Sequence, residues 1–145
     1  MIKNIIAMIC IFLMCGMGSA YARIKLVDNV YAFETSEGLK VGAVFGNLPA
    51  NGNLVSVTSP ACLRAELHEM TEVDGIMKMR QIHDIIPTDD AIIHFTATGY
   101  HIMLMGLKEP LKRGTTIPIT FKFKDGSSRD VMVPVVSRAY KKDVK

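Results

Sequence analysis

Residues 100–106 read YHIMLMG, an alternation of side chains that is typical of a β-strand. Successive side chains of an extended strand point to opposite faces of the sheet. The tyrosine, isoleucine and leucine of this stretch would therefore share one face, and His101, Met103 and Met105 would share the other. The first face is ordinary core material. The second face combines one imidazole with two thioethers, so it is the face on which we expect chemistry.

Imidazole nitrogen and thioether sulfur together suit a soft monovalent metal ion, and copper(I) above all. One such strand is a weak indication, because a methionine is more often a gap-filling core residue. A single histidine, likewise, is more often bonded to a backbone carbonyl than to a metal. The metal interpretation therefore requires matching donors elsewhere in the chain.

The rest of the chain after the N-terminal segment is a series of short β-branched or alternating segments bounded by turn residues. No segment reads as a helix longer than a turn or two. Eight or nine short strands without helices between them predict an all-β fold, an antiparallel β-sandwich or barrel with Greek-key topology expected. The expected strands are 24–33, 40–45, 54–58, 63–70, 76–82, 91–95, 100–105, 116–124 and 129–136.

Two further strands carry soft donors at alternate positions, His68 with Met70 and Met77 with Met79. Asp74-Gly75 predicts a two-residue hairpin turn between them. That turn would place Met70 opposite Met79, with His68 diagonal to it. However, it would also place two basic residues on the apolar face of the 63–70 strand, whereas a slip by one residue would bury both methionines. The sequence leaves both registers open.

Residues 1–22 have the pattern of a secretory signal peptide. Lys3 supplies a positive start, residues 5–17 are apolar and uncharged, and Ser19–Ala22 places small residues in the A-x-A arrangement of a cleavage site. We expect cleavage after Ala22, export to the periplasm, and a single mature domain, residues 23–145, without stable insertion into the membrane.

Two alternatives for the N-terminus are less well supported by its residues. A membrane anchor is disfavoured because the apolar run is shorter than the roughly 20 residues that span hydrocarbon. A lipoprotein interpretation through Cys15 is disfavoured because the bulky Met14 precedes it, where a small residue is expected.

Composition excludes several functional classes for the mature chain. Removing Lys3 with the leader leaves 16 Lys and Arg against 14 Asp and Glu, too balanced for a nucleic-acid-binding face. Cys62 is then the one remaining cysteine, which rules out an intramolecular disulfide and is more often a buried small hydrophobe than a reactive thiol. No nucleophile elbow or paired-carboxylate pattern indicates an enzyme. A blue-copper carrier would need a cysteine thiolate beside two histidines, and Cys62 is not placed in such a loop.

The spacing of the soft donors is specific. Ten residues separate His68 from Met79, 21 separate Met79 from His101, and Met103 completes a His-x-Met. This spacing resembles the signature of the periplasmic copper chaperone family called PCuAC. The surrounding runs are also similar to that family, namely LHE at 67–69, MKMR at 77–80, GYHIMLMGLK at 99–108 and the run from 110 to 118. The similarity covers nearly all of the mature chain.

The resemblance implies a cupredoxin-like β-sandwich with a copper(I) site made by four side chains, His68, Met79, His101 and Met103. It further implies that the protein delivers copper to the CuA centre during cytochrome c oxidase assembly, a role often played beside a Sco-type thiol protein. A copper-buffering or tolerance protein without a dedicated acceptor is the first alternative. A non-metal β-sandwich interaction module, in which the histidines and methionines are structural, is the second.

Residues outside the matched positions are expected to support the fold. Met70, Met77 and Met105 are expected in the shell around the site or in the core, with a role as alternate ligands if the strand register permits it, and His83 and His94 lie outside the motif. A solvated face is expected for the two nearest carboxylates, with orientation of a ligand histidine as their alternative role. Those carboxylates are Glu66 and Glu69.

Overall fold

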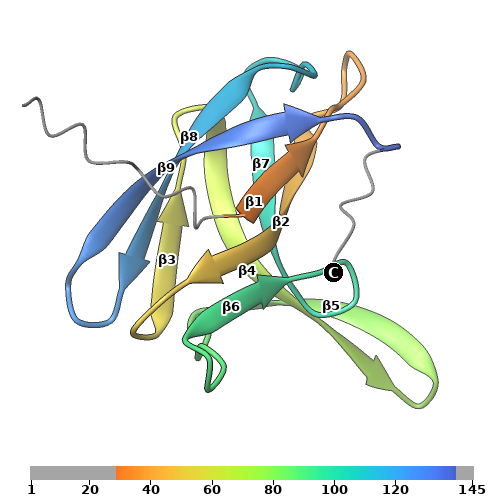
Figure 1. The fold of residues 1–145 in the computed structure, drawn as a ribbon. Helices are drawn as coiled ribbons and strands as arrows, with labels where there is room; N and C mark the ends of the chain where they lie inside the picture. The colour runs from red at the N-terminus through yellow and green to blue at the C-terminus, as the bar shows by residue number, and fades with distance from the viewer. Residues whose placement is uncertain (1–28, 140–145) are drawn as a thin grey trace, which may run out of the picture.

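The computed structural model describes residues 29–139, and within that range the chain forms nine strands and no helix (Figure 1). The all-β prediction is thus confirmed, and no described segment could cross a membrane as a helix. The expected residues 24–28 of the first strand and the whole signal peptide lie outside the described range. The strands are β1 Asn29–Phe33, β2 Val41–Pro49, β3 Leu54–Thr58, β4 Cys62–Val73, β5 Ile76–Ile82, β6 Ile92–Phe95, β7 Tyr100–Leu107, β8 Thr116–Phe123 and β9 Ser128–Val136.

The nine strands form one hydrogen-bonded series in the order β3-β8-β9-β1-β2-β6-β7-β4-β5, with β2 also pairing with β7. Strands far apart in the sequence lie side by side, β3 with β8 and β4 with β7, through the long connections that Greek-key arrangements use. Figure 1 shows β3, β8 and β9 on one side of the molecule and the remaining strands on the other. Most pairs are antiparallel; β1 with β9 and β6 with β7 are parallel.

A single hydrophobic core lies between these two sides. Phe121 of β8 stacks on Phe95 of β6 with ring centroids 6.5 Å apart, so the two sides are in direct contact. Ile102 and Leu104 of β7 are fully buried, as the alternation of the 100–106 stretch predicts. The opposite face of β7 is therefore turned away from the core, and it carries His101, Met103 and Met105.

Strand β2 runs four residues beyond its predicted end, and Gly46 explains why. Its φ of 112° lies in a region that residues with a Cβ rarely adopt. A Cβ at this position would lie 1.9 Å from the backbone oxygen of Asn29. This glycine lets the strand bend, so that residues 41–44 pair with β7 while residues 46–49 pair with β6.

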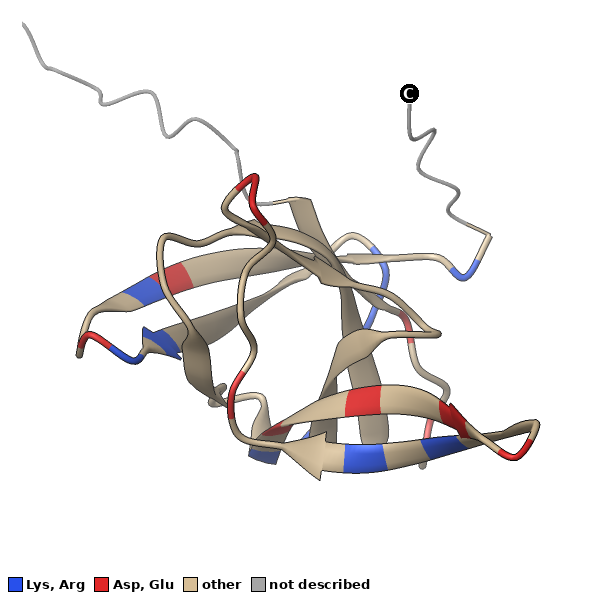
Figure 2. Ribbon diagram, turned by 90° about the horizontal axis from the view of Figure 1, so that it is seen from below, with Lys and Arg blue, Asp and Glu red and all other residues tan. Residues whose placement is uncertain are grey.

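The β4–β5 hairpin takes the register that places Met70 opposite Met79. Asp74 and Gly75 form the two-residue turn, with φ values of 53° and 76° that are typical of a type I′ turn. The basic side chains of β5 are tolerated because the hairpin extends beyond the core and β5 is exposed along nearly its whole length. Arg80 binds the carboxylate of Glu69 at 2.8 Å, and Figure 2 shows acidic residues of β4 facing basic residues of β5.

Candidate metal centre

Two histidines from distant parts of the sequence face each other across the pair β4–β7. His68 lies directly opposite His101 in the register, and their ring centroids are 5.9 Å apart. Both residues are buried, with 8% and 5% of their surface exposed. They are the buried polar residues found among the described ones, so the fold places two imidazoles together at the edge of an otherwise apolar interior.

Met79 reaches the same place from the β4–β5 hairpin. Its Sδ lies 3.3 Å from Nε2 of His101. A nitrogen and a sulfur that share one tetrahedral ion, at about 2.0 and 2.3 Å from it, lie about 3.5 Å apart. The observed separation therefore suits two donors of one ion. Met79 is 50% exposed, so this donor stands between the buried imidazoles and solvent.

Each histidine has one ring nitrogen bound to a hydrogen-bond acceptor. Nδ1 of His101 donates to the carbonyl oxygen of Gly99 at 3.2 Å, which leaves the Nε2 lone pair directed at Met79. Nε2 of His68 donates to the carboxylate of Glu66 at 2.8 Å. The other nitrogen of His68, Nδ1, is buried and has no hydrogen-bond partner. Buried polar atoms are normally satisfied, so this unpartnered nitrogen is the strongest local indication that the site takes a ligand.

Glu66 is not on a solvated face, so that expectation is wrong. Its side chain is only 14% exposed and contacts both His68 and Arg64 at 2.8 Å. The hydrogen bond from His68 lowers the pKa of the Glu66 carboxyl, and the charge of Arg64 lowers it further, against the effect of burial. An ionised Glu66 is thus available to hold the proton on Nε2 of His68. Glu69 has no such role, because it binds Arg80 on the other face.

The environment of His101 favours its uncharged form. Burial lowers its pKa, and the neighbouring His68 lowers it further, while the hydrogen bond to Gly99 partly offsets both. The ring of Phe45 on β2 lies 6.3 Å from the His101 ring and forms an aromatic wall beside it. A neutral imidazole can bind a metal ion, whereas a protonated one cannot.

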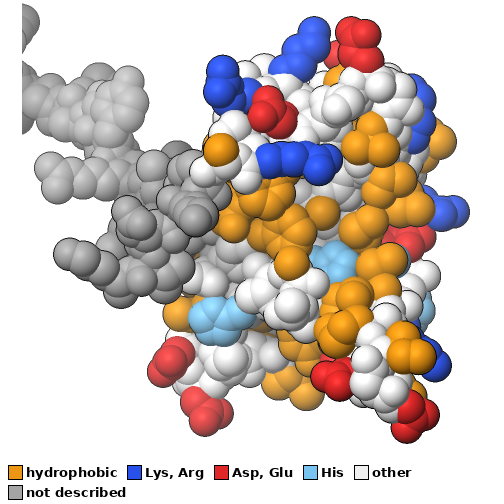
Figure 3. Space-filling model, turned by 90° about the vertical axis from the view of Figure 1, so that its right-hand side faces the viewer, with side chains coloured by type: hydrophobic (Ala, Val, Ile, Leu, Met, Phe, Trp, Pro, Cys, Tyr) orange, Lys and Arg blue, Asp and Glu red, His pale blue; other side chains and the backbone are white. Residues whose placement is uncertain are grey.

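Met103 lies on the same face of β7, two residues beyond His101 and opposite Glu66. Two residues along a strand span about 7 Å, and a flexible methionine side chain can reach across that distance toward His101. Met103 also lines an apolar groove with Phe33 and Phe45. In Figure 3 a histidine lies among hydrophobic side chains in the middle of one face of the molecule. Buried imidazoles beside a half-exposed thioether thus make a shallow surface site.

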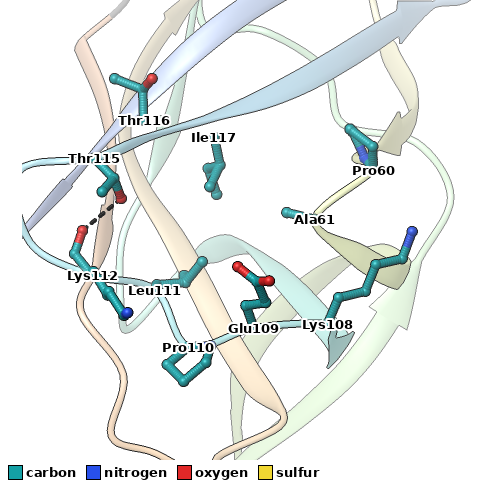
Figure 4. Close-up of a pocket in the computed structure, with 10 residues that line it drawn as sticks. All are labelled: Pro60, Ala61, Lys108, Glu109, Pro110, Leu111, Lys112, Thr115, Thr116 and Ile117. Carbon is teal, nitrogen blue, oxygen red and sulfur yellow. Dashed lines mark hydrogen bonds between the residues drawn. The ribbon is translucent and has the colours of Figure 1, made fainter.

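The other candidate residues lie elsewhere. His94 is exposed on β6 and bonds Asn47, and His83 is exposed after β5. Cys62 is 4% exposed, and burial raises the pKa of its thiol, as the structural interpretation of this cysteine predicts. A separate pocket at the far end of β7, near Lys108 and Leu111, is lined by no His, Cys or Met (Figure 4). Within residues 29–139 no three His, Cys, Asp or Glu side chains are grouped as metal ligands. The candidate set instead joins two histidines to methionines.

Comparison with known proteins agrees with this fold. The family described as "Putative lipoprotein LpqE-like" matches residues 26–135. The chain belongs to the LpqE-like family. A relative named "Putative lipoprotein Lxx21020", from Leifsonia xyli subsp. xyli (strain CTCB07), is 36% identical over an alignment of 120 residues, and the match covers 77% of this chain and 72% of the relative.

Solved structures similar to this LpqE-like chain carry the PCuAC fold that the sequence resemblance implies. Apo-DR1885 from Deinococcus radiodurans is 25% identical, with a TM-score of 0.60 and 80% of each chain covered. The structure titled CuI-DR1885 is 28% identical, with a TM-score of 0.54, and the match covers 76% of this chain and 78% of that one. The copper-bound PCuAC domain from PmoF2, at 12% identity and a TM-score of 0.58, shows the fold alone; 75% of this chain and 89% of that domain are covered.

Proposed function

We propose that this LpqE-like protein is an exported copper(I) chaperone of the PCuAC type. The observation that carries the proposal is the convergence of His68, Met79 and His101. The rings of His68 and His101 lie 5.9 Å apart, Met79 Sδ lies 3.3 Å from Nε2 of His101, and Nδ1 of His68 is buried without a partner. Met103 is the proposed fourth ligand, placed on the same face by the strand register.

The donor chemistry favours a monocation over a dication. Two neutral imidazoles and two thioethers bring no charge of their own, and thioether sulfur is a soft ligand that suits copper(I). Glu66 fixes the tautomer of His68, and Gly99 fixes that of His101. The ligands are therefore oriented before the ion arrives.

Transfer is proposed to proceed by stepwise ligand exchange from the exposed side. No thiolate belongs to the proposed set, and the half-exposed Met79 is the proposed donor nearest to solvent, on the side from which an acceptor would approach. The ion keeps its charge throughout, because each new dative bond replaces one that breaks. This is the chemistry of a carrier, and no residue at the site is arranged as a nucleophile with its base.

The finer parts of the proposal concern the acceptor and the compartment. The PCuAC resemblance supports delivery to the CuA centre of cytochrome c oxidase, with a Sco-type thiol protein as a second partner, and the signal-peptide pattern supports the periplasm. Gene disruption tests the acceptor: loss of CuA loading supports delivery, whereas copper sensitivity alone indicates a buffering protein.

The lipoprotein names of the relatives make the mature N-terminus worth measuring by mass spectrometry. Cleavage after Ala22 is expected, and a lipidated Cys15 would contradict it.

Titration with copper(I) against a competing chelator tests the site itself. We expect one tightly bound equivalent that is lost in the double variant His101→Ala, Met103→Ala. The double variant His94→Ala, Met132→Ala is the matched control, because it removes one exposed imidazole and one exposed thioether elsewhere. Equal binding by both variants would refute the proposal and favour a non-metal interaction module.

A further inference from the structure

Three methionines share the site face of the β4–β5 hairpin. Met70 on β4 lies opposite Met79, and Met77 precedes Met79 by two residues on β5. Because side chains alternate along a strand, all three thioethers are on the face that carries His68. Lys78 and Arg80 occupy the other face of β5. The methionines are thus confined to the side of the hairpin that adjoins the proposed copper site.

Packing in the core does not account for the two methionines of β5, and Met70 of β4 is half-buried. Met77 is 45% exposed and Met79 is 50% exposed, since this part of the hairpin extends beyond the sandwich. Isolated exposed apolar side chains need no explanation. Three thioethers on one face, beside the two imidazoles, place soft donors at neighbouring positions of the sheet.

The hydrogen bonding of Met70 brings its side chain close to that of Met79. The Met70 N–H donates to the carbonyl of Gly99 at 3.0 Å, so it points toward β7 and not toward β5. Met70 and Met79 are therefore a non-hydrogen-bonded pair, whose Cα atoms lie about 4.5 Å apart, with the side chains close together. The same Gly99 carbonyl accepts from Nδ1 of His101. The Gly99 carbonyl oxygen thus accepts from both the Met70 backbone and the His101 ring, whose Nε2 lies 3.3 Å from Met79 Sδ.

We propose that Met70, Met77 and Met79 form an outer copper(I) position through which the ion enters and leaves the inner site. This inference rests on the proposed function. Met79 belongs to both positions: its sulfur contacts His101 in the observed conformation, and its exposed side chain can turn outward to its two neighbours. In the exchange, bonds from copper to the thioethers of Met70 and Met77 form as the bonds to the imidazoles break. The ion stays monovalent, and no proton or electron moves.

A background without the inner site isolates the outer position. The double variant His68→Ala, His101→Ala, labelled with ¹³C at the methionine methyl groups, is titrated with copper(I), which is diamagnetic. We expect the methyl signals of Met70, Met77 and Met79 to shift while that of Met132 does not. Adding Met70→Leu should weaken this binding by about tenfold, as expected for the loss of one of three ligands. Unshifted Met70 and Met77 signals would overturn the outer position.

A kinetic measurement on the chain with both histidines covers the case in which that double variant does not fold. The protein is loaded with one equivalent of copper(I), and transfer to an excess of chelator is timed. Met70→Leu and Met77→Leu should each slow the transfer severalfold with little change in equilibrium affinity, and Met132→Leu should transfer at the unaltered rate. Equal rates in all variants would refute the outer position and leave the inner site standing. Absence of a tight equivalent in the unaltered chain would instead refute the proposed function.

Discussion

Replacing Glu66 by leucine should weaken copper(I) binding although Glu66 is not a proposed ligand. Its carboxylate accepts a hydrogen bond from Nε2 of His68 at 2.8 Å, and its side chain is only 14% exposed. Without that acceptor, the proton of the His68 ring is free to move to Nδ1, the atom through which we propose that His68 binds the ion. Loss of a partner behind a metal-binding histidine typically costs 10- to 100-fold in affinity, or about 1.4 to 2.7 kcal/mol.

Competition titration with copper(I) measures this loss, and two further variants sharpen it. Glu66→Gln keeps an oxygen acceptor and should lose less affinity than Glu66→Leu. Glu69→Leu is the matched control, since this carboxylate lies on the same strand, faces the other side and binds Arg80. Nitrogen-15 NMR of the ring should show the proton on Nε2 of His68 in the unaltered protein and a mixture of tautomers in Glu66→Leu. An affinity for Glu66→Leu equal to that of Glu69→Leu would refute the positioning role.

Three other predictions follow from the described residues. Gly46→Ala should lower the free energy of unfolding in urea by about 3 kcal/mol or more, because its Cβ would meet the Asn29 backbone oxygen at a strained φ. Gly52→Ala, which has open space around it, should change that free energy by less than about 1 kcal/mol. Equal effects of the two substitutions would contradict the reason given for the bend in β2. Cys62 should react with iodoacetamide far more slowly in the folded chain than in urea, because burial raises the pKa of its thiol and lowers its thiolate fraction at any given pH; rapid labelling of the folded protein would contradict this. Arg80→Ala should lower the free energy of unfolding by no more than about 1 kcal/mol, because it breaks an exposed ion pair with Glu69. A larger decrease would show that the hairpin register depends on that pair.

Local patterns predicted most of the strands correctly, and the errors have specific causes. The bounds of β3 and β5 agree with the prediction because turn residues flank both strands on each side. The end of β2 was predicted too early because Gly46 reads as a turn residue in the sequence. In the structure its unusual φ lets the strand bend and exchange β7 for β6 as its neighbour. A glycine signals conformational freedom but does not say whether a strand ends there or only bends.

The register of the β4–β5 hairpin and the role of Glu66 could not be predicted in the same way. The turn at Asp74 favoured the observed register, while the basic residues of β5 argued against it. That conflict disappears once the hairpin is seen to leave the core, which no local pattern reveals. Glu66 follows the alternation of β4 onto the site face, but its contact with His68 depends on how two neighbouring side chains turn. The alternation was the available signal, and it could not distinguish a solvated carboxylate from one bonded to a ligand.

The amino-acid sequence alone was enough to establish an all-β chain and to single out two histidines and two methionines at a specific spacing. It could do so because alternation and spacing are properties of consecutive residues. Which strands became neighbours was settled only by folding, since pairing depends on burial and hydrogen bonding between segments dozens of residues apart. That pairing put His68 opposite His101, brought Met79 Sδ to 3.3 Å from an imidazole nitrogen, and left Nδ1 of His68 buried without a hydrogen-bond partner.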